Sequence, residues 1–73
     1  MNKSDIHIGD LLYWNTNGAY NTKVSLKCKV LDIGRRFIWI MVFGNLSPTP
    51  AELNDVSKDP LYKVTNENSK GWY

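Results

Sequence analysis

A change of hydropathy pattern between residues 23 and 43 constrains the fold of this chain more than any other feature. Residues 23–30 alternate strictly between polar and apolar side chains, which is typical of a strand with one buried face. After the turn residues Gly34-Arg35-Arg36, residues 37–43 form an unbroken apolar run, which is typical of a strand covered on both faces. The two segments therefore predict a hairpin in which a strand with a basic outer face lies next to a central strand.

The residues before this hairpin, and a break in its first strand, extend the predicted sheet. Residues 6–8 are expected to form a short strand with both isoleucines on one face, and residues 11–14 a second strand or the continuation of the first across a bulge. Residues 15–21 contain three asparagines and a glycine and are predicted to be a loop. The strand over residues 22–33 loses its alternation at Val30-Leu31, which predicts a β-bulge. A bulge there would bend the strand and let a small sheet curl into a barrel.

The residues after the apolar run predict a short helix and a last strand. Thr49-Pro50-Ala51-Glu52 has the pattern of a capping box with proline at the first helical position, so we expect a short helix or helical turn at about residues 50–57. Asp59-Pro60 ends it, because the residue before a proline avoids the helical conformation. Residues 61–65 are expected to form the final strand. Together these elements predict a mainly β fold, a single domain over residues 1–73 built as a small five-stranded antiparallel barrel.

Composition limits the functions open to the chain. Its 73 residues, 42% of them apolar, suffice for one small core but not for a deep pocket, so we expect no small-molecule substrate and no cofactor. Cys28 is the single cysteine and lies on the apolar phase of its strand, which favours a buried structural thiol. The polar first residues lack an apolar signal segment, and the apolar run is too short to span a bilayer. We therefore expect a cytoplasmic protein that does not bind membranes.

The sequence offers little to catalysis or metal binding. His7 is the only histidine, and its neighbours Asp5 and Asp10 do not form a triad with a nucleophile at any recognisable spacing. His7 and Cys28 provide one metal ligand of each kind, whereas a zinc site needs three or four. We therefore expect no enzyme activity, no catalytic residues and no metal site.

The order of the predicted elements resembles that of the SH3-like small barrels, particularly the Tudor and KOW types. The segments that carry the resemblance are Ile8-Gly9-Asp10-Leu11-Leu12, the bent strand Val24–Ile33, Met41-Val42-Phe43-Gly44-Asn45 and the short helix at Pro50–Val56. The resemblance implies a five-stranded barrel with a helical turn before the last strand.

Tudor domains typically bind methylated arginine or lysine in a cage of aromatic rings. In this chain the aromatic residues at comparable places are Tyr13, Trp14, Tyr20 and Phe43. The family usually has an acidic residue just after the third strand, where this chain has Gly44-Asn45. The same aromatic side chains also suit a small core, so cage chemistry and core packing are both open interpretations.

Basic residues gather in one stretch of the chain. Residues 23–36 contain five basic side chains against Asp32 alone, although the net charge of the whole chain is only +2. Alternate lysines would project from one strand face at a spacing close to that of backbone phosphates, with aromatic rings beside them for stacking on unpaired bases. The candidate nucleic-acid-binding residues are Lys23, Lys27, Lys29, Arg35, Arg36, Trp14 and Tyr20. The other interpretation is a solvated lysine face that prevents edge pairing.

The apolar run gives the leading functional hypothesis. A barrel core takes one phase of residues 37–43, and the other phase must be covered by the chain itself or by a partner. If the even-numbered phase stays open, its branched aliphatic residues would form an interaction patch. The candidate protein-binding residues are Ile38, Ile40, Val42, Tyr13 and Trp72. The chain is therefore expected to be a non-catalytic interaction module that binds a protein partner, of an adaptor or inhibitor type such as phages encode, or that self-associates. Nucleic-acid binding is the alternative.

Overall fold

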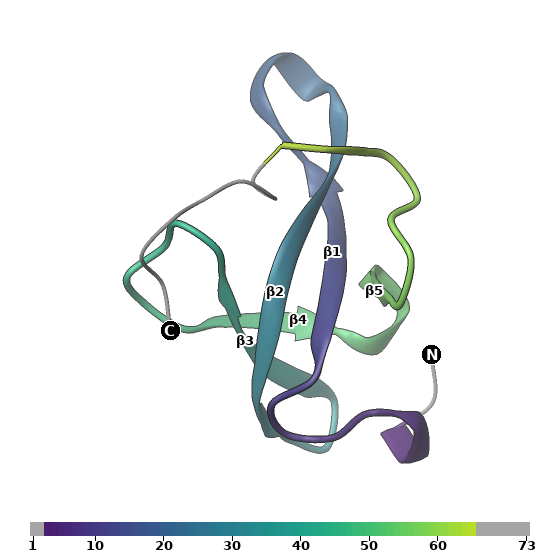
Figure 1. Ribbon diagram of the computed structural model, residues 1–73, viewed down its shortest axis with the longest axis vertical. Helices are drawn as coiled ribbons and strands as arrows, with labels where there is room; N and C mark the ends of the chain where they lie inside the picture. Colours follow the sequence, from purple (N-terminus) through teal and green to yellow (C-terminus); the bar gives the residue numbers. More distant parts are fainter. Residues whose placement is uncertain (1–2, 66–73) are drawn as a thin grey trace.

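One curled antiparallel sheet dominates the computed structural model, which describes residues 3–65 (Figure 1). The strands of the described residues are β1 (Leu11–Asn17), β2 (Lys23–Ile33), β3 (Phe37–Val42), β4 (Thr49–Glu52), β5 (Val56–Ser57) and β6 (Lys63–Val64). Three short 3-10 turns accompany them, η1 (Lys3–Asp5), η2 (Ala19–Asn21) and η3 (Leu53–Asp55). Five strands pair antiparallel in the order β4-β3-β2-β1-β5 and curl into a half-barrel, while β6 pairs parallel to β2. The predicted mainly β fold with a curled, five-stranded antiparallel sheet is confirmed.

β2 and β3 form the predicted hairpin around which the sheet curls. The register of this pair shifts between Val30 and Asp32, which leaves Leu31 without an opposite residue. The predicted β-bulge is therefore confirmed, and it bends the eleven-residue β2 near its end. β3 lies between β2 and β4, which confirms its predicted place inside the sheet.

The concave face of the sheet holds the apolar core. Its buried side chains come from all five antiparallel strands and from the segment before β1, and they are Ile6, Leu12, Cys28, Val30, Ile38, Ile40, Val42, Ala51 and Val56. Four partly buried side chains pack against them, Trp14, Leu26, Ile33 and Leu53. Burial of this apolar surface is the main stabilising contribution in so small a chain, and the opposite face of the sheet, which we call the outer face, is left for other roles.

The segment before β1 differs from the prediction. Ile6 enters the core while Ile8 is exposed, so the two isoleucines do not share a face, and no strand forms between them. The reason is a tight turn. The backbone N–H of His7 donates to Asp10 Oδ2 at 2.9 Å, and the N–H of Asp10 donates to the carbonyl oxygen of His7 at 3.0 Å. Gly9 completes the turn at a φ of 95°, a conformation that favours glycine.

β1 is longer than predicted, because it continues through Asn17 into the segment assigned to a loop. The actual turn is shorter, and the N–H of Gly18 donates to the carbonyl oxygen of Thr22 at 2.6 Å to close it. Tyr20 and Asn21 adopt φ values of 57° and 59° within this turn. A loop is therefore present within residues 15–21, but it is shorter than predicted.

Residues 49–52 form an edge strand and not the first turn of a helix. They pair with β3, and Ala51 is buried in the core. The helical turn follows directly as η3, so a helical turn within residues 50–57 is confirmed. The capping box is not formed, because Glu52 is the N-cap of η3 and its side chain makes no capping hydrogen bond.

Residues 58–65, which we call the strap, form the last described part of the chain. They leave β5 and cross β1 and β2 near the η2 end of that hairpin, in yellow-green in Figure 1. The predicted final strand is present only as β6, and it pairs parallel with Val24 and Ser25 of β2. The strap thereby runs from one side of the β1–β2 pair to the other.

None of the described segments forms an apolar helix long enough to cross a membrane.

Cys28 is buried on the inward phase of β2, as predicted, and its Sγ donates to the carbonyl oxygen of Leu12 at 3.5 Å. Burial raises the pKa of the thiol from 9.0 to about 12. Because the thiolate is the reactive form, we expect Ellman's reagent at mildly alkaline pH to react about a thousandfold more slowly with the folded than with the unfolded chain. Fast reaction in the absence of denaturant would contradict this burial.

The buried thiol of Cys28 also affects stability at alkaline pH. Since the unfolded chain loses the thiol proton first, the free energy of unfolding falls as the pH rises from 9.0 towards about 12.

Candidate interaction surface

The outer face of the sheet carries rows of cross-strand neighbours. Leu11, Lys29 and Met41 lie opposite one another on β1, β2 and β3. In the next row Tyr13 pairs with Lys27, and the N–H of Phe43 donates to the carbonyl oxygen of Lys27 at 3.0 Å. Beyond the bulge Trp39 lies between Asp32 and Pro50, and Phe37 lies opposite Glu52. This face therefore mixes apolar, basic and acidic side chains in adjacent rows.

Phe37 and Trp39 form the most exposed aromatic part of β3. Their side chains are 45% and 43% exposed, although the strand is paired on both edges. They line a shallow hollow of about 350 Å³ together with Gly34, Arg35 and Arg36 of the preceding turn. Residues 3–65 therefore leave both rings partly exposed, so the cover predicted for this face of the strand is incomplete among the described residues. We call these five residues the aromatic hollow.

Three of the predicted protein-binding residues belong to the core and not to a surface. Ile38 and Ile40 are 0% exposed and Val42 is 3% exposed, so the even-numbered phase of the run faces inward and the interpretation of it as an open patch is wrong. The sequence signal for the surface was present in the odd-numbered residues of the same run, which β3 turns outward. Tyr13 is half-buried on the outer face, and Trp72 lies outside the described residues.

The lysine row of β2 lies on the outer face, but it is interrupted. Ser25 lies on the same outer phase as Lys23 and Lys27, but it is 0% exposed because the strap passes over it. The ammonium group of Lys23 lies 5.7 Å from the centroid of the Tyr62 ring on the strap. That of Lys27 lies at the same distance from the Phe43 ring. Both lysines are therefore engaged with aromatic rings.

The other predicted nucleic-acid-binding residues are spread over the molecule. Arg35 and Arg36 are exposed at the turn that follows β2, whereas Tyr20 is exposed in the turn that precedes it, at the opposite end of that strand. Trp14 packs against the core. The structure therefore does not bring these residues together with the lysine row.

The aromatic residues compared with a Tudor cage do not form one. Tyr13 and Trp14 are consecutive in β1 and face opposite sides of the sheet, Trp14 towards the core. Tyr20 stands apart in the η2 turn, and Phe43 lies beside Lys27. The core-packing interpretation is correct for Trp14.

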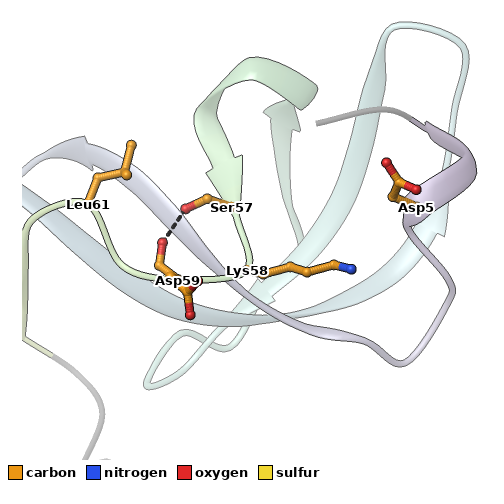
Figure 2. Close-up of a pocket in the computed structure, with 5 residues that line it drawn as sticks. All are labelled: Asp5, Ser57, Lys58, Asp59 and Leu61. Carbon is orange, nitrogen blue, oxygen red and sulfur yellow. Dashed lines mark hydrogen bonds between the residues drawn. The ribbon is translucent and has the colours of Figure 1, made fainter.

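A second hollow, of about 460 Å³, lies between the strap and η1. It is lined by Asp5, Ser57, Lys58, Asp59 and Leu61 (Figure 2). In this view Lys58 extends across the hollow towards Asp5, and the hydroxyl of Ser57 donates to the carbonyl oxygen of Asp59 at 2.6 Å. No group of three potential metal ligands occurs among residues 3–65. No sequence pattern predicts this hollow, because its residues come from distant segments.

Comparison with protein-family models, with curated protein sequences and with solved structures found no match for this chain.

Proposed function

We propose that this protein is a non-catalytic interaction module that binds a protein partner through the aromatic hollow. The observation that carries the proposal is the exposure of Phe37 and Trp39 side by side on a strand that is paired on both edges. A soluble fold gains nothing from leaving two large rings in water, whereas aromatic and arginine side chains dominate the energetics of protein interfaces. The strand order also resembles that of SH3-like small barrels, and we include that narrower fold assignment in the proposal.

The chemistry of the hollow indicates what the partner presents. A surface formed by Phe37 and Trp39 suits one large apolar side chain, and a hollow of about 350 Å³ is of the size such a side chain and its neighbours fill. Arg35 and Arg36 at its rim favour carboxylates on the partner. The expected partner is therefore a protein segment with an apolar anchor next to acidic residues.

Acidic neighbours favour protein over nucleic acid as the ligand of this surface. Asp32 is the cross-strand neighbour of Trp39, and Glu52 is that of Phe37. Carboxylates in these places repel a nucleic acid, which brings a phosphate with every nucleotide, more than a protein segment that places a single carboxylate at the arginine rim. The interruption of the lysine row by the strap at Ser25 acts in the same direction. Nucleic-acid binding is therefore the less favoured alternative, and the experiment below distinguishes it from protein binding.

To test the proposal, the wild type and two double variants are each used as bait to capture proteins from extracts of the source cells, with nuclease added. Phe37→Ser/Trp39→Ser removes both rings, and Tyr20→Ser/Leu46→Ser removes two apolar side chains that are 99% and 97% exposed elsewhere. We expect a protein that is captured by the wild type and by the control, with retention by the hollow variant lowered about tenfold or more, since interface hot spots cost at least about 2 kcal/mol each. The captured protein is then purified and titrated against all three chains.

Three results would contradict the proposal. The first is equal retention by both double variants, and the second is capture that disappears with nuclease or falls steeply between about 50 and 200 mM salt. The third is a concentration-dependent dimer in sedimentation that the hollow variant abolishes, because a second copy would then occupy the hollow.

A further inference from the structure

The strap is fastened to the sheet by a set of hydrogen bonds centred on one buried hydroxyl. The N–H groups of Leu61 and Tyr62 donate to Ser25 Oγ at 3.1 and 2.9 Å. The same hydroxyl donates to Asn15 Oδ1 at 2.6 Å. Asn15 Nδ2 in turn donates at 3.0 Å to Oγ of Ser57, the residue of β5 that directly precedes the strap. We call Ser25, Asn15 and Ser57 the clasp.

Apolar packing contributes little to this attachment. None of the strap residues belongs to the core cluster, in which Val56 is the last member along the chain. Leu61 is 65% exposed, and β6 contributes only two residues of parallel pairing. A segment that is fixed by a few polar contacts and buries little apolar surface opens at a lower free energy than a strand of the core.

We infer that the strap is a conformational cover that opens as a unit while the curled sheet stays folded. Closed, it shields Ser25 and occupies the edge of β2 at Val24 and Ser25. Open, it uncovers the outer face between Lys23 and Lys27, so the interrupted lysine row becomes continuous. The clasp hydroxyl of Ser25 is the contact that determines the balance between the two states, because it bonds to both strap amides and to Asn15. This inference does not depend on the proposed function, which concerns the other end of the outer face.

Amide hydrogen exchange of the full chain, followed by NMR, tests the inference. The Leu61 and Tyr62 amides report on the strap. The Val30 amide, which donates to the carbonyl oxygen of Asp10 at 2.9 Å, reports on the sheet. We expect the two strap amides to exchange about a hundredfold or more faster than Val30, and their exchange to be insensitive to low denaturant concentrations, because opening of the strap exposes little surface.

Ser25→Ala removes the acceptor of the Tyr62 amide and the nearer acceptor of the Leu61 amide, which also lies 3.4 Å from Asn15 Oδ1. The variant is expected to speed the exchange of both amides about tenfold or more, with Val30 protection changed far less. Ser57→Ala loosens the clasp from its other side and provides the same test if Ser25→Ala folds poorly. Ser47→Ala, at an exposed serine in the loop between β3 and β4, is the matched control and should leave the exchange of the strap amides unchanged.

Equal protection and equal denaturant dependence of the Leu61, Tyr62 and Val30 amides in the wild type would overturn the inference. So would clasp variants that lower the protection of all three amides together.

Discussion

Ile40→Ala is expected to lower the free energy of unfolding by about 2–5 kcal/mol, the largest stability effect that we predict for this protein. The side chain is 0% exposed at the centre of the core, so its truncation loses buried apolar surface and leaves a cavity. A chain of this size has roughly 4–11 kcal/mol of stability in total, so the variant stands near the limit of folding. Urea unfolding followed by circular dichroism measures the change.

Two further variants make that measurement specific. Ile40→Val removes one methyl group and should cost about 0.5–1.5 kcal/mol, which keeps a folded protein for comparison. Trp39→Ala changes the neighbouring residue on the opposite face and should cost about 1 kcal/mol or less, because this ring is 43% exposed. If Trp39→Ala destabilised the protein as much as Ile40→Ala, the assignment of the two faces of β3 would be wrong.

Gly34→Ala is expected to lower the free energy of unfolding by about 1–3 kcal/mol, because the added methyl group has no room. A Cβ at this position would lie 2.8 Å from the carbonyl oxygen of Phe37, which is a backbone atom and cannot rotate away. The N–H of Gly34 donates to that same oxygen at 2.8 Å, so relief of the clash would break the bond that closes the turn between β2 and β3.

Arg35→Ala is the matched control for Gly34→Ala, since it alters the next residue of the same turn without touching the backbone contact. We expect it to change stability by about 0.5 kcal/mol or less, as is usual for an exposed side chain. Equal stability of Gly34→Ala and the wild type in urea unfolding would show that this turn adopts another conformation.

Elements with strong local signals were predictable from the sequence. Three local patterns each indicate one backbone conformation, and the structure contains all three. They are the alternation of residues 23–30, the broken phase at Val30-Leu31 and the turn at residues 34–36. The burial of Cys28 followed from the same alternation. Periodicity was sufficient there because one face of the strand packs on the core.

The errors arose where tertiary contacts outweighed a local pattern. Thr49-Pro50-Ala51-Glu52 matches a capping box, but a place beside β3 allows Ala51 to be buried and gives its backbone partners in the sheet. Ser25 matches the solvent phase of β2, but a segment more than thirty residues away brings two amides to its hydroxyl. Neither contact can be predicted from the neighbouring residues in the sequence.

The candidate surface could be predicted only in part, for a related reason. A seven-residue run without polar residues does not reveal which phase faces the core, because both phases of residues 37–43 are apolar. The register of the neighbouring strands decides it, and that register depends on the bulge at Leu31. The residues proposed as an open patch, Ile38, Ile40 and Val42, are therefore the buried phase of this strand.

Pro50 in β4 also affects strand pairing between molecules of this protein. β4 is the outermost strand next to β3, and it places Pro50 directly opposite Trp39. A proline has no amide hydrogen, so a foreign strand that adds to this border finds a gap in its hydrogen-bond ladder. Pro50 therefore disfavours strand addition at the edge that lies one strand away from the exposed Phe37 and Trp39 rings.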